Sequence, residues 1–167
     1  MMTRLVMPIF RREFLMKGKY TGQVLITCLL IFLLGISDLF AGEIYKSFFS
    51  GIAINGYDPV NYFTENKAEK GSPDIKFKWK EATWLFKTNK NRSLFKSYPN
   101  KYAPQYGGHC ANGMSEGHKV SSDQTLWRII DGKLFMFYSK KGRDRWSSNT
   151  DQWIKDANQN WLIFKYD

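Results

Sequence analysis

Four side chains that can bind a metal or react as a nucleophile lie close together in residues 106–120. This stretch reads YGGHCANGMSEGHKV and contains His109, Cys110, Met114 and His118. It holds both histidines of the chain and the only cysteine outside an apolar N-terminal run. Thiolate, thioether and imidazole together favour Cu(I) among the biological metals. One hypothesis is therefore a site for copper or another soft metal centred on Cys110, with the other three side chains as candidate ligands.

The spacing of these residues also supports a purely structural interpretation. Cys110 and Met114 are four residues apart, so one helical turn would place both on the same face. His118 could return to that side, but Gly113 and Gly117 argue against a continuous helix. The tight repeated spacing of zinc motifs is absent from this stretch. The alternative is that Cys110 and Met114 pack in the core, since free cysteine is among the most buried residue types.

A thiol-dependent enzyme is the third interpretation of the stretch. Such an enzyme needs Cys110 as a thiolate, a histidine as base and a third group that orients the histidine. Backbone N–H groups near Gly107 and Gly108 would stabilise the thiolate if they opened a helix. No acidic residue is placed by the sequence to orient a histidine, so we predict no catalytic residues. The two glycines are predicted to supply backbone angles closed to other residues, or a close approach of the chain.

The N-terminal part of the chain has the organisation of an export signal. Residues 24–34 read VLITCLLIFLL, basic residues precede them, and GISDLFAG follows with Ala41 before the expected cut. This order predicts a signal peptide over residues 1–41, with Met16 as an alternative start. The other possibility is an uncleaved anchor, although a bilayer-spanning helix needs about 20 apolar residues. We predict a periplasmic or secreted protein with a leader over residues 42–51.

The charge of the exported part bears on its partners. Without residues 1–41 the chain has 20 Lys and Arg against 13 Asp and Glu, a net charge of about +7. The lysines are scattered, and an exported protein rarely meets nucleic acid, so we predict no nucleic-acid partner. The scattered charge predicts a solvated basic surface, for which contact with an anionic membrane surface is one possible use. A single cysteine in the exported part excludes an internal disulfide, and the oligomeric state has no signal in the sequence.

Two β-hairpins are predicted from alternating apolar residues and from turn signals. In IKFKWK every second residue is apolar, and lysines fill the other face. An Asp-Gly pair between two apolar runs is a strong hairpin signal. The predicted strands are residues 75–80, 83–87, 125–130 and 133–138, with turns at Glu81–Ala82 and Asp131–Gly132.

Several short helices are predicted around these hairpins, because capping residues precede segments with apolar residues at helical spacing. Hairpins and helices that do not alternate regularly predict an α+β fold. We expect a single domain with a small antiparallel sheet built from two hairpins, packed against several short helices. The same periodicities place Trp79, Trp127 and Trp153 towards the core. The predicted helices cover residues 60–63, 89–98, 140–146 and 150–161, with Asp58, Thr88, Ser139 and Thr150 as their caps.

Three motifs resemble those of the YHS-domain family. They are GYDPVNYF, WLFKTNKNRSLFKSYPNKY and YGGHCANGMSEG, and the similarity covers residues 52–161. The string PNKYAPQYGG is especially similar to the small exported branch of that family. The resemblance implies a YHS-type domain over residues 52–167, with a treble-clef-like core. It also implies that Cys110 belongs to the shared framework, whereas relatives usually carry an aromatic residue at His109 and often a lysine near His118.

A second branch of the family holds a metal through cysteines between its hairpin and its first long helix. At the matching positions this chain has Asn61, Lys87 and Asn91, none of which is a cysteine. The resemblance therefore implies the fold but not that metal site. We predict a binding module of the bacterial envelope that binds a soft metal such as Cu(I) through Cys110. The alternative is a module with a structural Cys110 that binds a small ligand or a protein through its basic face and aromatic pocket.

Overall fold

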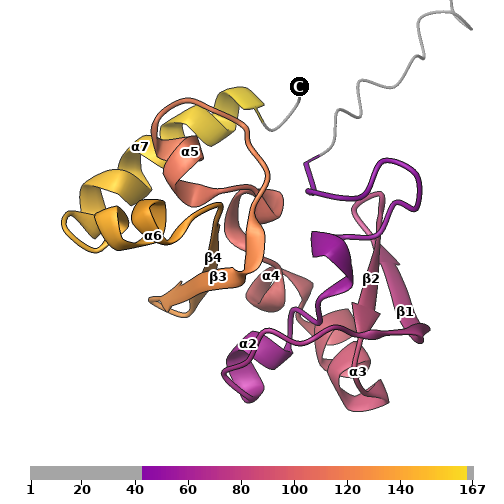
Figure 1. Cartoon of the computed structure of the whole chain (residues 1–167). Helices are drawn as coiled ribbons and strands as arrows, with labels where there is room; N and C mark the ends of the chain where they lie inside the picture. The colour runs from indigo at the N-terminus through magenta and orange to yellow at the C-terminus, as the bar shows by residue number, and fades with distance from the viewer. Residues whose placement is uncertain (1–42, 165–167) are drawn as a thin grey trace, which may run out of the picture. The chain divides into compact units, whose positions relative to one another are not determined.

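The computed structural model describes residues 43–164, which belong to one compact unit formed by residues 39–167 (Figure 1). The predicted signal peptide or anchor over residues 1–41 lies outside the described residues. Within residues 43–164 no helix combines the length and the apolar character that crossing a membrane requires.

The first hairpin consists of β1 (Ser72–Trp79) and β2 (Ala82–Phe86), which pair antiparallel. Its lysines are exposed and its alternate apolar residues half-buried, which confirms the predicted alternation. Because Trp79 pairs with Ala82, the turn is Lys80–Glu81, one residue earlier than predicted. Both turn residues have positive φ, 47° and 57°, as the two-residue turn of a tight hairpin requires.

The second hairpin joins β3 (Asp123–Ile130) to β4 (Lys133–Phe137) through the predicted Asp131–Gly132 turn. The two turn residues have φ values of 49° and 70°, which is the conformation that favours an Asp-Gly pair. The two hairpins form two separate two-stranded sheets. Together with the short helices they confirm the predicted α+β fold and its single domain.

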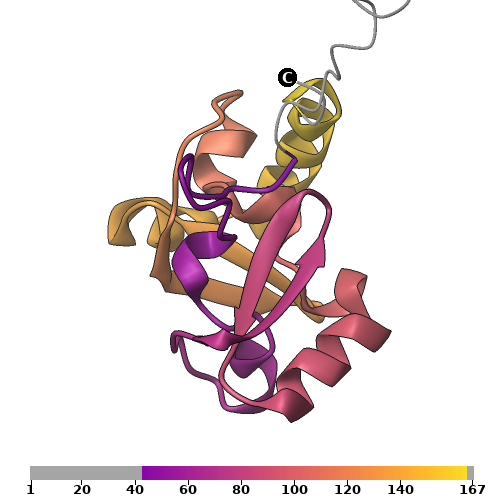
Figure 2. The same cartoon turned by 90° about the vertical axis from the view of Figure 1, so that its right-hand side faces the viewer.

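Strand β4 lies between two hydrophobic cores. In Figure 2 the hairpin to which it belongs passes behind the first hairpin. The side chains of β4 alternate, so that Leu134 and Met136 enter the first core while Phe135 and Phe137 enter the second. Each face of this strand is therefore buried. The first core also contains Ile44, Ala53, Ile54, Val60, Tyr62, Ala82, Trp84, Phe86, Phe95, Tyr102 and Ala103, and the second contains Tyr106, Ala111, Met114, Trp146 and Ala157.

Most of the helices are short, as predicted, and two of the predicted capping side chains begin a helix. The Thr88 hydroxyl accepts a hydrogen bond from the Asn91 N–H at 3.1 Å, and the Ser139 hydroxyl accepts one from the Gly142 N–H at 3.2 Å. These two predicted caps are confirmed. The helical segments are η1 (Ile54–Gly56), α2 (Asn61–Thr64), α3 (Asn89–Ser97), α4 (Pro99–Tyr102), η2 (Gln105–Gly108), α5 (Ala111–Ser115), α6 (Lys140–Trp146) and α7 (Thr150–Phe164).

Two predicted caps act differently from expectation. Helix α2 begins at Asn61, and Asp58 accepts a hydrogen bond from the Val60 N–H ahead of it, at 2.9 Å. Thr150 is the first residue of α7 rather than its cap, because its hydroxyl donates backwards to the Trp146 carbonyl at 2.9 Å. The threonine therefore links α7 to the end of α6.

The three tryptophans that were predicted to face the core do so, but each of them is only half-buried. Trp79 and Trp127 are half-buried against the first core, and Trp153 is half-buried against the second. The fully buried tryptophans among the described residues are Trp84 and Trp146. These two large rings supply much of the apolar area that each core removes from water.

Gly107 lets the N-terminal segment approach the loop that precedes Cys110. It has φ +61°, and its carbonyl accepts a hydrogen bond from the Tyr45 N–H at 2.8 Å. A Cβ atom on this residue would lie 1.6 Å from the Glu43 carbonyl oxygen. The predicted need for glycine here is confirmed, and the close approach is to backbone.

Candidate functional site

The Cys110 side chain caps helix α5. Its sulfur accepts hydrogen bonds from the Gly113 N–H at 3.4 Å and from the Tyr138 N–H at 3.2 Å. The donors are therefore not the N–H groups of Gly107 and Gly108 that the sequence suggested. The residue is 4% exposed, so its sulfur has little access to solvent.

The backbone of Cys110 is held as firmly as its sulfur. Its N–H donates to the Val120 carbonyl at 3.0 Å, and its carbonyl accepts from the Met114 N–H at 2.9 Å. The residue also forms an isolated β-bridge with Met136 of strand β4. Cys110 thus joins α5, the loop before β3 and the central strand at one point, which is a structural role.

Met114 and His118 lie in different environments. Met114 is fully buried in the second core, near Phe135 and Trp146. His118 is exposed, and its N–H donates to the Gly113 carbonyl at 2.8 Å, just after α5 ends. Helix α5 runs through Gly113 and ends at Ser115, before Gly117 with its φ of 78°, so the stretch has no continuous helix but Gly113 does not break it.

His109 lies between two aromatic rings. Its ring centroid is 5.5 Å from that of Tyr45 and 6.3 Å from that of Trp161. Its Nδ1 is 3.3 Å from the Val120 carbonyl oxygen, which assigns the ring proton to Nδ1 in the neutral form. Its Nε2 is buried without a hydrogen-bond partner among the described residues. His109 therefore lies among aromatic rings, with a buried ring nitrogen that has no hydrogen-bond partner among the described residues.

Burial lowers the pKa of His109 to about 4, and the nearby Lys119 charge acts in the same direction. Between pH 6.5 and 4 the unfolded chain binds a proton here that the folded chain excludes. We expect the free energy of unfolding to fall by about 3 kcal/mol as the pH drops through this window. In His109→Phe this part of the pH dependence should vanish in urea unfolding curves, whereas His118→Gln should retain it. An unchanged slope in His109→Phe would contradict the assignment.

The four residues named as metal ligands do not form one cluster. Cys110 and Met114 are enclosed, His118 faces solvent, and His109 fills an aromatic position. Within residues 43–164 no three His, Cys, Asp or Glu side chains are grouped so as to hold a metal ion. The arrangement favours the structural interpretation of Cys110 and leaves the soft-metal site as a prediction.

A second polar cluster is centred on Asp58, which is fully buried. One carboxylate oxygen accepts the Val60 N–H at 2.9 Å. The other accepts the Lys87 N–H and the Asn91 side-chain amide, both at 2.7 Å. Buried charge is tolerated where donors surround it, so Asp58 holds the start of α2 against the end of β2 and the first turn of α3.

The cluster extends from Asn91 to the surface. The Asn91 amide also donates to the Asn61 side-chain oxygen at 2.7 Å, and the Asn61 amide donates to Glu69 at 2.7 Å. The Lys87 ammonium pairs with the same Glu69 oxygen at 2.6 Å. This hydrogen bond lowers the pKa of Glu69 and raises that of Lys87. Asn61, Lys87 and Asn91 therefore meet in one network, although 30 residues separate the two asparagines.

A groove opens beside the first core, with a volume of about 730 Å³. Its lining is partly apolar and partly polar, since the Tyr57 ring and Leu85 line it together with hydroxyl, amide and charged groups. The Lys70 ammonium lies over the Tyr57 ring, 5.5 Å from its centroid. The groove is lined by Ser47, Ser50, Ile52, Asn55, Gly56, Tyr57, Lys70, Gly71, Pro73, Leu85, Ser122, Asp123 and Gln124.

The turn at the edge of this groove has unusual backbone angles. Ile54 and Asn55 have φ values of 41° and 52°. Positive φ is a genuine outlier for a β-branched residue and concentrates at functional sites. The buried Ile54 side chain and a hydrogen bond from the Asn55 amide to Gln124 at 2.7 Å hold the turn in this conformation. The sequence had pointed to Asn55 only as part of a turn, and nothing in it signalled the groove.

No family model, curated protein or solved structure matches this chain. The described residues define its class by architecture alone, as an α+β domain with two hairpins, two cores and several short helices. The similarity to the YHS-domain family consequently rests on the sequence motifs.

Proposed function

We propose that the protein is a small exported binding module of the bacterial envelope, of the YHS type, in which Cys110 is structural. Its ligand is a small molecule that occupies the groove described above. The observation that carries the proposal is the groove itself, because aromatic, amide, hydroxyl and charged groups converge there beside a strained turn. This is the non-metal alternative of the two binding functions that the sequence suggested.

The chemistry of the groove favours a polar ligand with a flat apolar face. The Tyr57 ring offers a stacking surface and Lys70 offers a cation for a carboxylate or similar anion. Asn55 and Asp123 add an amide and a carboxylate to the lining. A ligand with few polar groups would leave these side chains without partners, which costs binding free energy.

The surroundings of Cys110 favour a small-molecule ligand in the groove over a soft metal at the cysteine. Its sulfur is held by two backbone N–H groups in a residue that is 4% exposed, so a metal ion could reach it only if the surrounding backbone opened. Met114 could reach a metal only by leaving the second core, where it is fully buried. A thiol-dependent enzyme meets the same barrier, because a nucleophile must be reachable by its substrate.

One NMR titration tests the groove and the metal alternative together. We expect small polar aromatic fragments to shift the amide signals of Gly56, Tyr57, Gly71 and Asp123. Added Cu(I), under reducing conditions, should leave the signal of Cys110 unchanged. Tyr57→Ala should weaken fragment binding about tenfold, since it removes one stacking ring.

The matched control is Lys90→Ala, an exposed change on α3 that does not line the groove. This variant should bind the fragments as the wild type does. Fragment shifts that cluster elsewhere would sink the groove proposal. A stoichiometric Cu(I) complex that Cys110→Ala abolishes would restore the soft-metal hypothesis.

A further inference from the structure

Two phenylalanines project into solvent near the start of the described chain. Phe48 is 94% exposed and Phe49 is 96% exposed, and their rings contact each other edge to face at 5.3 Å. The turn that carries them is well formed, because the Ser47 N–H donates to the Ile52 carbonyl and the Gly51 N–H donates to the Ser47 carbonyl. The pair is thus displayed on a hydrogen-bonded turn, outside both cores.

A second exposed apolar group lies at the end of α7. Leu162 is 71% exposed and Ile163 is 65% exposed. The Lys119 ammonium donates to the Phe164 carbonyl at 3.1 Å, so the segment that carries the exposed Val120 is bonded to the end of α7. Adjacent exposed apolar side chains of this size are uncommon on soluble proteins and mark interaction surfaces.

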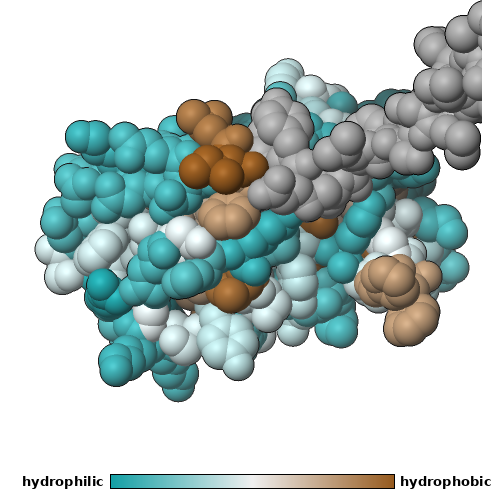
Figure 3. Space-filling view, turned by 90° about the horizontal axis from the view of Figure 1, so that it is seen from above, coloured by the Kyte–Doolittle hydropathy of each residue, from teal (hydrophilic) through white to brown (hydrophobic). Residues whose placement is uncertain are grey.

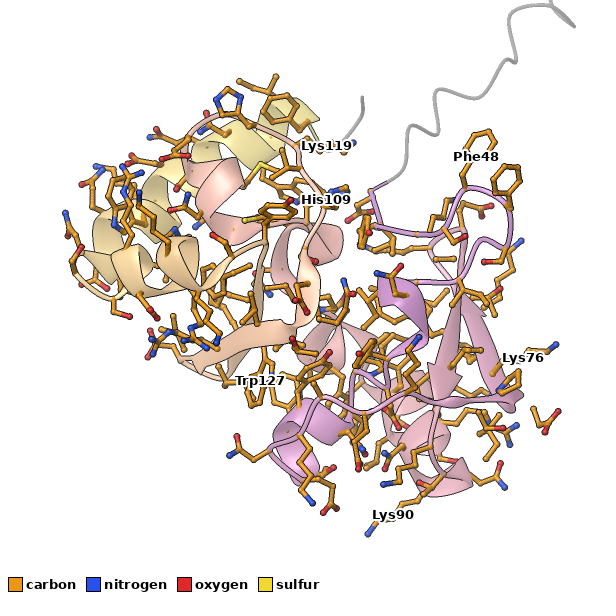
Figure 4. All side chains as sticks on the ribbon, in the orientation of Figure 1. Phe48, Lys76, Lys90, His109, Lys119 and Trp127 are labelled. Atoms are coloured by element: carbon orange, nitrogen blue, oxygen red, sulfur yellow. The ribbon has the colours of Figure 1, made fainter. Side chains whose placement is uncertain are left out.

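Both groups lie on one face of the domain. Figure 3 looks onto this face and shows hydrophobic side chains in two places among hydrophilic ones. Figure 4 places Phe48 and Lys119 at the same end of the molecule. The described chain also starts at this end, because Tyr45 contacts His109, which in turn contacts Trp161 of α7. We call Phe48, Phe49, Val120, Leu162 and Ile163 the apolar face.

The position of the apolar run in the sequence indicates what covers this face. Residues 24–34 end nine residues before Glu43, a distance of about 30 Å at full extension. An uncleaved anchor, the alternative to the predicted signal peptide, would therefore hold this end of the domain close to the lipid surface. After cleavage, the docking rests on the apolar face and on the charge near it.

The charge near the apolar face fits an anionic surface. Lys46 and Lys119 flank its two groups in sequence, and the nearby Glu43 carboxylate is neutralised by Lys80 at 2.7 Å. Aromatic side chains prefer the interfacial region of a bilayer, and lysines beside them are attracted to anionic headgroups. The exported part as a whole is basic, with a net charge of about +7.

We propose that the apolar face docks the domain on an anionic phospholipid bilayer, with Phe48 and Phe49 inserted at the interface. The apolar face differs from the ligand groove because its side chains are apolar, whereas the groove is lined by polar and charged groups as well. The two surfaces are neighbours, since Ser47 and Ser50 of the groove flank the two phenylalanines. Docking would accordingly bring the groove close to the lipid surface.

Vesicle binding by residues 42–167 tests the proposal, because both cores of the domain lie wholly within this segment. We expect co-sedimentation with vesicles of phosphatidylcholine mixed with phosphatidylglycerol, and weaker binding at high salt. Phe48→Ser with Phe49→Ser should weaken binding by tenfold or more, since each buried phenylalanine contributes at least about one order of magnitude in affinity. Leu162→Ser with Ile163→Ser should weaken it as well.

The matched control is Tyr98→Ser, which removes an exposed aromatic side chain that follows α3. It should leave vesicle binding unchanged. Equal binding by the wild type and the Phe48, Phe49 variant would overturn the proposal, as would a wild type that binds no vesicles. Light scattering tests whether a second copy of the chain covers the apolar face. If the protein is a dimer in solution and the Phe48, Phe49 variant is a monomer, the face is a dimer interface and the membrane proposal is overturned.

Discussion

Replacing Asp58 by alanine is expected to lower the free energy of unfolding by about 4 kcal/mol, enough to unfold a marginally stable domain. The carboxylate is fully buried and accepts hydrogen bonds from the Val60 N–H, the Lys87 N–H and the Asn91 amide. Alanine leaves the Val60 and Lys87 N–H groups without an acceptor and removes one of the two acceptors of the Asn91 amide. Each orphaned buried donor costs about 1–3 kcal/mol. Because these donors come from three separate elements, the loss should loosen α2, β2 and α3 together.

Urea unfolding followed by tryptophan fluorescence measures this effect, since Trp84 lies in the first core beside the network. Asp58→Asn should fall between the wild type and Asp58→Ala, because an amide keeps one acceptor but adds hydrogens next to existing donors. The control is Asp74→Ala, which removes an exposed carboxylate from β1 and should change stability by less than about 0.5 kcal/mol. A stability loss of that small size for Asp58→Ala would show that the network contributes little.

The parts of the fold that the sequence predicted well depend on short-range patterns. In β1, alternation of apolar residues and lysines is a property of a few neighbouring residues, and the structure has that alternation. The Asp131–Gly132 turn and the caps Thr88 and Ser139 are equally local. Each of these features needs only the chemistry of residues within about four positions.

The features that were missed depend on the tertiary arrangement. Strand β4 itself was predicted, but its burial on both faces was not, because that burial depends on the two cores between which the strand lies. The first hairpin turns at Lys80–Glu81, where neither residue favours positive φ, and the pairing of Trp79 with Ala82 imposes it. Propensity is a weak guide wherever packing decides the conformation.

The candidate site divides in the same way. The sequence grouped His109, Cys110, Met114 and His118 because they are neighbours in the chain. Burial separates them, since α5 turns Met114 into a core while His118 faces solvent. The sequence had also treated the three positions 61, 87 and 91 merely as lost metal ligands. The structure brings them into one hydrogen-bonded network, a contact that spans distant segments and has no local signal.

That network leads to the second large expected effect. Cysteines at the three positions, introduced as Asn61→Cys, Lys87→Cys and Asn91→Cys, should create a zinc or cobalt site. The asparagine side chains are already 2.7 Å apart, and the Lys87 N–H shares the Asp58 oxygen that Asn91 contacts. Three thiolates with the Asp58 carboxylate would complete a tetrahedral set. We expect one metal ion per chain with a Kd in the micromolar range or tighter, against no binding by the wild type.

Cobalt is the better probe, because thiolate-to-cobalt absorption reports the number of sulfur ligands directly. The matched control carries three cysteines at exposed positions, as Asn66→Cys, Lys76→Cys and Lys96→Cys, and should bind cobalt weakly without that spectrum. A folded triple variant that binds no metal would count against the proposed similarity to the YHS-domain family. Tight binding would instead mean that the chain keeps the geometry of a metal site, in which a carboxylate, two amides and an ion pair now cross-link the same three elements.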